Sequence, residues 1–145
     1  MKTYFICSSG GHLTELIYSV GADVFKLNPT LLTYEDMNVN GVTYFKLINP
    51  HRSLFKYFLC FVQTFKYFLK RPPDVIFSTG AGIAIPGIIL GKLFFKSDIV
   101  FIESLAYINR PTITGRLAYY FSDLFIVQNK ELLKIYPNAR LGRLI

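Results

Sequence analysis

Short apolar runs that end in glycine, serine or glutamate alternate with longer runs of helical character along this chain of 145 residues. Such alternation is typical of parallel strands joined by helices. We therefore predict an α/β fold, a Rossmann-like doubly wound and mainly parallel sheet, in a single domain over residues 1–145. The expected strands are Thr3–Cys7, Asp23–Leu27, Val42–Leu47, Asp74–Phe77, Asp98–Ile102 and Leu124–Val127, with a polar segment over Thr33–Asn40. The expected helices are His12–Val20, Ser53–Lys70, a third that ends near Phe95, Thr112–Phe121 and Lys130–Tyr136.

Polar and glycine-rich segments fall where three of the expected strands end, at residues 8–12, 78–82 and 103–109. Parallel strands point their carboxyl ends to one edge of the sheet, and the ligands of open α/β sheets bind beyond that edge. The three segments are therefore predicted to converge on one ligand site.

The first of these segments, Ser8-Ser9-Gly10-Gly11-His12, joins a strand to a helix. Paired glycines let the backbone approach a ligand closely, and a helix N-terminus favours an anion. His12 is therefore a candidate general base near neutral pH. The alternative is a tight turn with an exposed histidine that does no chemistry. The spacing does not match the dinucleotide-binding pattern G-x-G-x-x-G.

The second segment contains the turn Gly80-Ala81-Gly82. Its glycines are candidates for a cradle that holds a phosphate or a polar head group. The alternative is that they serve only the close packing of a helix on the sheet. Gly87 and Gly91, further along that helix, are expected to serve packing in either case.

Glu103 ends the third strand-like run, IVFIE. A carboxylate at the carboxyl end of a buried strand is well placed to meet a substrate hydroxyl. The alternatives are that Glu103 caps a loop or forms an ion pair with Arg110 or Arg116. The residues alone do not decide between these roles.

The helix expected over Ser53–Lys70 is apolar over well more than half of its surface, whereas a helix that flanks a sheet needs only about a third. Its polar residues share one narrow face: Arg52, Lys56, Gln63, Lys66 and Lys70. A bilayer interface or a partner chain is expected to cover the excess, and the basic, aromatic-rich margin favours the interface. The alternative is burial under other parts of the domain. The side chains expected at the membrane are Lys56, Phe58, Phe61, Phe65 and Lys66.

The chain combines 52% hydrophobic residues with a net charge of +7. This combination suits an anionic membrane surface, although a basic surface without a specific role is the alternative. Nucleic acid is not an expected partner, because the basic residues follow an apolar helix rather than an exposed aromatic platform. Cys7 and Cys60 lie in apolar runs and are expected to be buried thiols in a reducing cytoplasm. No signal peptide, spanning helix or metal-ligand spacing is visible, so neither a metal nor a cofactor is expected.

Three stretches resemble the family of membrane-anchoring glycosyltransferase subunits: FICSSGGHLTEL, VIFSTGAGIAIPGIILGKLF and FIESLAYINRPTITGRLAYYFSDLFIVQNKEL. The eukaryotic member of that family is one half of the enzyme that adds the second N-acetylglucosamine to a dolichol-diphosphate-linked sugar. Bacterial PssD- and CpsF-like members serve capsule and exopolysaccharide assembly. A more distant similarity is to the N-terminal domain of MurG, the single-chain enzyme of lipid II synthesis.

The resemblance implies one half of a GT-B glycosyltransferase that is split into two chains. This chain would bind the acceptor and the membrane, peripherally on the cytoplasmic face, and a donor-binding partner chain would hold the UDP-sugar. The implied reaction is metal-independent transfer of a sugar to a lipid-diphosphate-linked acceptor. The candidate catalytic residues by this match are His12, as the base, and Glu103. The residues implied to bind the acceptor are Ser9, Gly10, Gly11, Gly80, Gly82 and Asn109.

Two features depart from the family pattern. The segment between His12 and Thr43 is short, and no hydrophobic anchor precedes the first strand, which favours a bacterial, peripherally bound form. Two rival functions remain open at this point. The chain would either recruit and activate a catalytic partner without contributing a catalytic group, or act as a self-sufficient nucleotide-binding enzyme.

Overall fold

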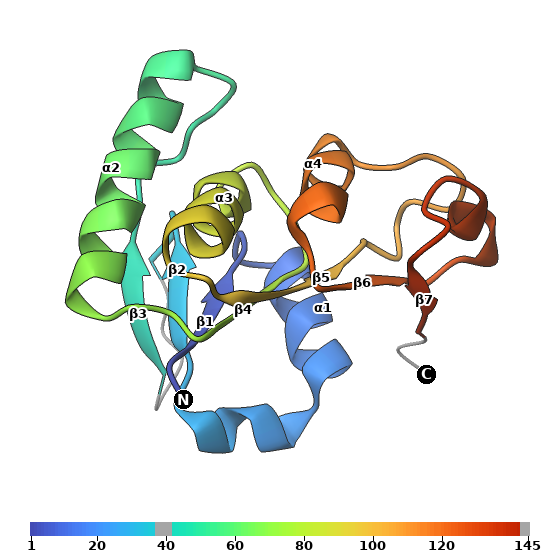
Figure 1. Cartoon of the computed structure of the whole chain (residues 1–145), viewed down its shortest axis with the longest axis horizontal. Helices are drawn as coiled ribbons and strands as arrows, with labels where there is room; N and C mark the ends of the chain where they lie inside the picture. Colours follow the sequence, from blue (N-terminus) through green and yellow to red (C-terminus); the bar gives the residue numbers. More distant parts are fainter. Residues whose placement is uncertain (37–41, 143–145) are drawn as a thin grey trace.

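In a computed structural model of the protein, which describes residues 1–36 and 42–142, seven parallel strands form one sheet (Figure 1). Their order is β3-β2-β1-β4-β5-β6-β7, which extends by one strand the order of a doubly wound dinucleotide-binding fold. The strands are β1 Thr3–Ile6, β2 Thr30–Thr33, β3 Thr43–Lys46, β4 Val75–Ser78, β5 Asp98–Ile102, β6 Leu124–Val127 and β7 Arg140–Leu141. The helices are α1 Gly11–Val20, α2 Leu54–Lys70, α3 Ala84–Phe94 and α4 Ile113–Phe121, with 3-10 turns η1 Ala22–Leu27 and η2 Lys130–Lys134. The predicted Rossmann-like fold class is confirmed.

The predicted strand Asp23–Leu27 is wrong, because these residues lie in the 3-10 turn η1. Asp23 and Lys26 form an ion pair at 2.6 Å that the three-residue spacing of the turn allows. Asn28 then ends the turn with φ of 49°, in the left-handed region that short polar residues tolerate. The inner strand is instead β2, which follows directly and is buried along its whole length. Part of the polar segment Thr33–Asn40 lies outside the described residues.

One further prediction needs adjustment near the C-terminus, and one short strand there was not predicted. The predicted helix Lys130–Tyr136 is a shorter 3-10 turn, η2, and the two-residue strand β7 after it was not anticipated. β7 pairs with β6 at the edge of the sheet. A strand of two residues carries too little alternation to be seen in a sequence.

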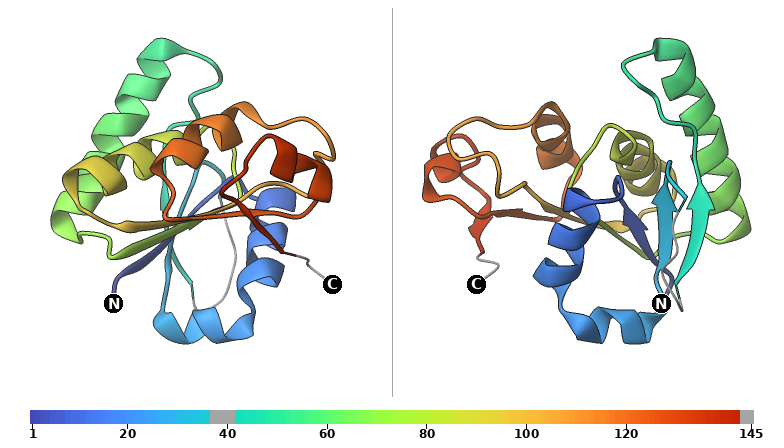
Figure 2. Two further views of the ribbon diagram at one scale, coloured as in Figure 1. Left: turned by 45° about the vertical axis from the view of Figure 1, so that its right-hand side comes forward. Right: turned by 180° about the vertical axis from the view of Figure 1, so that it is seen from behind.

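The sheet separates two hydrophobic cores, and Figures 1 and 2 show helices on both of its faces. α2, α3 and α4 cover one face, and α1 with η1 covers the other. Strand β1 serves both layers because successive side chains of a strand point to opposite faces. Tyr4 and Ile6 join the core under α3, whereas Phe5, and Cys7 just after the strand, join the core against α1.

The close approach of α3 to the sheet depends on two of its glycines. A Cβ atom at Gly87 would overlap Ile6, and one at Gly91 would overlap Ile76. Both glycines therefore serve packing, as predicted. Cys7 and Cys60 are buried free thiols, also as predicted, and burial raises the pKa of Cys7 to about 12 and that of Cys60 to about 11.

Candidate functional site

The strand order reverses direction between β1 and β4, which lie side by side at the centre of the sheet. The chain leaves β1 toward α1 on one face and leaves β4 toward α3 on the other (Figure 1). The two loops diverge at their strands' carboxyl ends, and a doubly wound sheet binds its ligands in the crevice between such loops. The first two predicted segments, residues 8–12 and 78–82, therefore meet at the expected place.

The turn that follows β1 needs glycine for its conformation. Gly10 has φ of 78° and ψ of −130° at the N-terminal end of α1, a backbone region open essentially only to glycine. A Cβ atom at Gly10 or Gly11 would meet no other atom within 4 Å. Both residues are exposed and Ser9 is half-buried. The space above this turn is therefore open to an approaching molecule.

His12 lies in the first turn of α1 and is held from the opposite side of the crevice. The Thr79 hydroxyl donates a hydrogen bond to the His12 carbonyl at 2.6 Å. Gly80 has φ of 123°, and a Cβ atom there would lie 3.3 Å from His12 Cε1. His12 Nδ1 is buried and has no hydrogen-bond partner within residues 1–36 and 42–142. The imidazole therefore packs against the β4 loop, which leaves Nε2 as the nitrogen able to meet a ligand.

A cavity of about 300 Å³ opens beside this histidine. We call it the first cavity, and its lining residues are His12, Gly80, Ala81, Tyr107, Pro111, Thr112, Ile113 and Thr114. Of the predicted site residues, His12 and Gly80 come together in this lining. Asn109 lies on the exposed loop after β5 and is not among the residues that line this cavity. Gly82 lines an adjoining second cavity instead, where a Cβ atom would overlap the Tyr57 hydroxyl.

Glu103 is fully buried under the first turn of α4. Its carboxylate accepts hydrogen bonds from the Ser104 and Thr112 backbone amides, both at 3.2 Å. It also accepts from the Thr112 hydroxyl at 2.9 Å and from the Tyr136 hydroxyl at 3.3 Å. The Thr112 hydroxyl in turn accepts from the Gly115 amide at 2.7 Å and so caps α4. Glu103 thus holds the loop that forms one wall of the first cavity.

This geometry favours the alternative in which Glu103 caps a loop. The carboxylate is not among the groups that line the first cavity, and all four of its partners are hydrogen-bond donors. Burial is the larger cause that raises the pKa of Tyr136, and the nearby Glu103 is the smaller one. The phenol therefore stays a neutral donor. A catalytic role for Glu103 stays a prediction.

A second buried network was missed at the sequence level. The Gln128 side-chain amide donates to the Glu103 carbonyl and to the Glu15 carboxylate, both at 3.0 Å. Glu15 also accepts from the Leu105 amide and so ties α1 to the loop after β5. Gln128 follows the strand LFIV just as Glu103 follows IVFI. A polar residue at the carboxyl end of a strand is the signal that indicates Glu103, and the same signal indicates Gln128.

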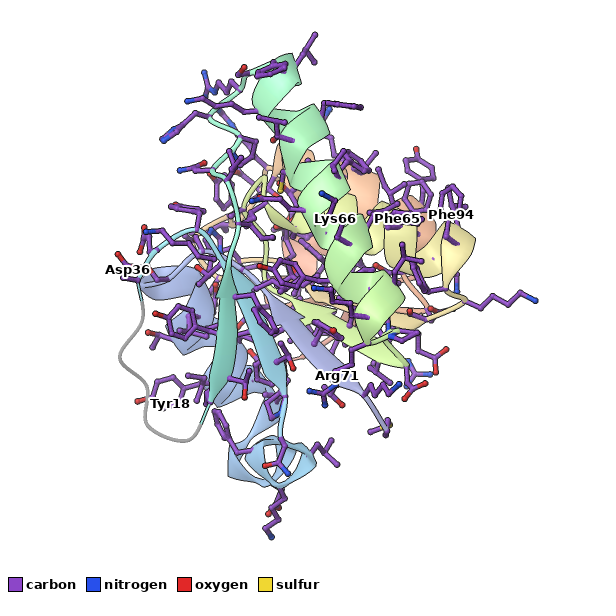
Figure 3. All side chains as sticks on the ribbon, turned by 90° about the vertical axis from the view of Figure 1, so that its left-hand side faces the viewer. Tyr18, Asp36, Phe65, Lys66, Arg71 and Phe94 are labelled. Carbon is purple, nitrogen blue, oxygen red and sulfur yellow. The ribbon has the colours of Figure 1, made fainter. Side chains whose placement is uncertain are left out.

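The outward side of α2 exposes apolar side chains. Phe55, Phe58 and Leu69 are 69%, 62% and 60% exposed. Lys56 and Lys66 are exposed as well, and Figure 3 shows Lys66 projecting from the helix. The excess apolar surface predicted for this helix is therefore present on the described chain.

Two of the five side chains predicted to contact the membrane are instead partly buried. Phe61 and Phe65 pack against the core under α3. The Phe65 ring lies 6.2 Å from the Phe94 ring, on the neighbouring α3 (Figure 3). The prediction placed them on the outer surface because the sequence does not show that α3 packs against α2.

The apolar surface continues over the other two helices of this layer. Its members on α3 and α4 are Leu93, Phe94, Ile113 and Tyr120, between 62% and 83% exposed. We call these four residues, with Phe55, Phe58 and Leu69, the outer apolar face. Within the described part of the chain, no helix is both long and apolar enough to cross a bilayer. Nor do three potential metal-ligating side chains come together in the same part.

Comparisons with known proteins agree with this architecture. The family model described as oligosaccharide biosynthesis protein Alg14-like matches residues 49–144. The UDP-N-acetylglucosamine transferase subunit ALG14 of Homo sapiens is 25% identical over 97% of this chain and 81% of its own length.

Two solved structures share the fold. MurG of Acinetobacter baumannii superimposes with a TM-score of 0.68 at 12% identity, over 90% of this chain and 43% of MurG. UDP-N-acetylglucosamine 2-epimerase of Rickettsia bellii gives a TM-score of 0.73 at 16% identity, over 94% of this chain and 41% of the epimerase. This chain therefore spans less than half of either solved protein.

Proposed function

The chain belongs to the family of Alg14-like oligosaccharide biosynthesis proteins, and we propose that it is the acceptor-side, membrane-associated half of a two-chain glycosyltransferase. A donor-binding partner chain holds a UDP-sugar, and its sugar is transferred without a metal ion to a lipid-diphosphate-linked acceptor. The human relative is called a subunit of a UDP-N-acetylglucosamine transferase. UDP-N-acetylglucosamine is therefore the first donor to test.

The observation that carries this proposal is the first cavity at the switch point of the sheet. It brings His12 to an open hollow of about 300 Å³ at the carboxyl ends of the strands, where such sheets bind ligands. Because Nδ1 is buried against the β4 loop, His12 is expected to meet the acceptor hydroxyl through Nε2, on the side that faces the first cavity.

The partner chain is proposed because the human relative, covered over 81% of its length, is named a subunit of a transferase. Less than half of MurG or of the epimerase corresponds to this chain. A cleft between two Rossmann-like domains needs roughly another 150 residues. A separate chain that supplies the second domain would close the cleft over the first cavity and bring the UDP-sugar to His12.

The membrane role is supported by the outer apolar face and the net charge. Apolar side chains on α2, α3 and α4 lie on one side of the sheet, and lysines flank them on α2. Aromatic residues with basic neighbours are typical of helices that lie in the interface of an anionic leaflet. The chain is therefore proposed to bind peripherally at the cytoplasmic face, with the acceptor lipid in the same leaflet.

The catalytic part is tested by transfer of radiolabelled N-acetylglucosamine to a lipid-diphosphate acceptor, with the two chains co-purified or separate. Transfer is expected only from the pair, and His12→Asn should lower kcat by about 100-fold or more. Thermal unfolding and co-purification report whether the variant still folds and assembles. Full turnover by the His12→Asn pair would leave the chain as a recruiter without a catalytic group.

The membrane part is tested by co-sedimentation with vesicles that contain anionic lipid. Replacing both Phe55 and Phe58 with serine should weaken binding about 10- to 100-fold, because both rings lose apolar contact with the bilayer. The matched control is Tyr18→Ser, since Tyr18 is 71% exposed on α1 at the opposite face of the sheet. Equal loss from the Tyr18 variant would contradict the assignment of this face.

A further inference from the structure

Three cavities adjoin one another, from His12 to the helices α3 and α4. The first cavity, beside His12, and the second share Ala81, Ile113 and Thr114 as lining residues. A third, of about 410 Å³, shares Ile85 and Ile113 with the second. Side chains of α3 and α4 therefore lead in one unbroken series from the histidine to the outer apolar face.

The chemical character changes along this series. The third cavity is lined by Ile85, Ile113, Arg116, Leu117 and Tyr120, which are mostly apolar. Two of these residues, Ile113 and Tyr120, belong to the outer apolar face. The first cavity is lined by hydroxyl groups and His12 together with Ala81, Pro111 and Ile113, with no lysine or arginine among its described lining residues.

The second cavity, of about 340 Å³, lies between them and collects hydrogen-bond donors and a cation. Asn49, His51, Arg52 and the Tyr57 hydroxyl line it, and no aspartate or glutamate is among its described lining residues. Burial raises the pKa of Tyr57, so its phenol is a neutral donor. The N-terminal end of α3, which favours an anion, forms part of the wall through Gly82 and Ile83.

The turn that carries the cation has an unfavourable backbone. His51 and Arg52 have φ of 42° and 60°, in the left-handed region where residues with a side chain are uncommon. The turn is closed by a hydrogen bond from the Ser53 amide to the Pro50 carbonyl at 2.8 Å, and Asn49 Oδ1 accepts from the His51 amide at 3.3 Å. Strained backbone conformations of this kind are found mostly at active sites and ligand sites, where the surrounding structure holds them in place.

We propose that the second cavity is the diphosphate subsite of the acceptor, with the guanidinium of Arg52 as its principal ligand and the His51 imidazole, whose Nε2 lies 3.0 Å from Asn49 Nδ2, as a second ligand through Nδ1. The sugar then extends into the first cavity toward His12, and the first lipid units lie in the third cavity between α3 and α4. The polarity of the three cavities follows the order sugar, diphosphate and lipid. This inference rests on the proposed function and adds to it the residues that select a diphosphate.

Binding of farnesyl diphosphate to the purified chain in detergent, measured by titration calorimetry, tests the subsite without the partner chain. Arg52→Ala should weaken binding about 10- to 100-fold, because a charged hydrogen-bonding partner of the phosphates is lost. Arg52→Lys should recover part of the affinity. Lys26→Ala, which removes the same charge from an exposed position on η1, is the matched control and should bind as the parent does. Farnesol should bind equally to the parent and to Arg52→Ala.

A glycine variant separates a functional role of Arg52 from a structural one. Glycine adopts positive φ without strain, so Arg52→Gly should unfold at a higher temperature than the parent and yet bind farnesyl diphosphate at least 10-fold more weakly. Affinity within twofold of the parent for both Arg52→Gly and Arg52→Ala would overturn the subsite. If those variants bind normally while the two-chain complex transfers sugar, the proposed function stands and only the subsite fails. If they bind weakly while the complex transfers no sugar, the subsite stands and the reaction is wrong.

Discussion

Replacing Glu103 with glutamine separates a structural carboxylate from a catalytic one. All four groups that contact the carboxylate are donors, and two of them, the amides of Ser104 and Thr112, cannot rotate to accept. One amide contacts each carboxylate oxygen. In either orientation the glutamine NH₂ group therefore faces a backbone N–H that is buried, at Ser104, or partly buried, at Thr112. The substitution leaves that N–H without an acceptor.

The cost follows from these contacts. An unsatisfied buried N–H costs about 1–3 kcal/mol, and the bonds that remain lose their ionic character, which makes each about half as strong. We expect a total of about 2–4 kcal/mol, against a stability of about 5–15 kcal/mol for a domain. The melting temperature should fall by about 5–12 °C for a chain of this size.

Urea unfolding followed by circular dichroism measures this loss directly. The control is Glu131→Gln, because Glu131 pairs with Lys134 on the exposed surface, where ion pairs contribute about 0–1 kcal/mol. An unchanged urea midpoint for Glu103→Gln, together with loss of transfer by the two-chain complex, would refute the structural role and favour a carboxylate that acts on the substrate.

Two further predictions concern stability. Gly87→Ala should destabilise the fold by about 1–3 kcal/mol in urea unfolding, because its Cβ would overlap the fully buried Ile6. The control is Gly11→Ala, which has open space around its Cβ and should unfold as the parent does. Equal losses of stability in the two variants would contradict this packing. Burial alone would raise the pKa of Asp123, but hydrogen bonds from Lys92 and a backbone amide lower it below the ordinary value of an aspartate. A carboxylate with a lowered pKa stabilises the fold above about pH 4, and this stabilisation is lost as the pH falls. The stability of Asp123→Asn should therefore depend less steeply on pH below about 4 than that of the parent. An unchanged acid profile would show that this carboxylate does not contribute.

Long periodic segments and strand ends were predictable because each has a local signal. β1 and α2 follow from apolar runs of the right length, and the meeting of His12 with Gly80 follows from the convergence of strand ends in a parallel sheet. The strand β2 was missed because its run, TLLT, is no longer than the neighbouring run that folds as η1. Short apolar runs of this kind do not distinguish strand from helix.

The remainder of the site depends on tertiary contacts. Glu103 was predicted at a strand end, but one of the donors to its carboxylate, the Tyr136 hydroxyl, lies 33 residues away in the sequence. The strained turn at Arg52 carries no glycine to mark its positive φ. The inward packing of Phe65 depends on α3. The contact of Glu103 with Tyr136 and the packing of Phe65 become visible only when distant elements are placed side by side.

The most direct test of the central claim is to measure which substrate the purified chain binds by itself. Equilibrium binding in detergent should be compared for a lipid-diphosphate-linked sugar and for UDP-N-acetylglucosamine. An acceptor-side half is expected to bind the lipid-linked sugar and to show no measurable affinity for the nucleotide sugar until the partner chain is added. Saturable binding of UDP-N-acetylglucosamine by the chain alone, with none of the lipid-linked sugar, would contradict the proposed division of labour and favour a self-sufficient nucleotide-binding enzyme.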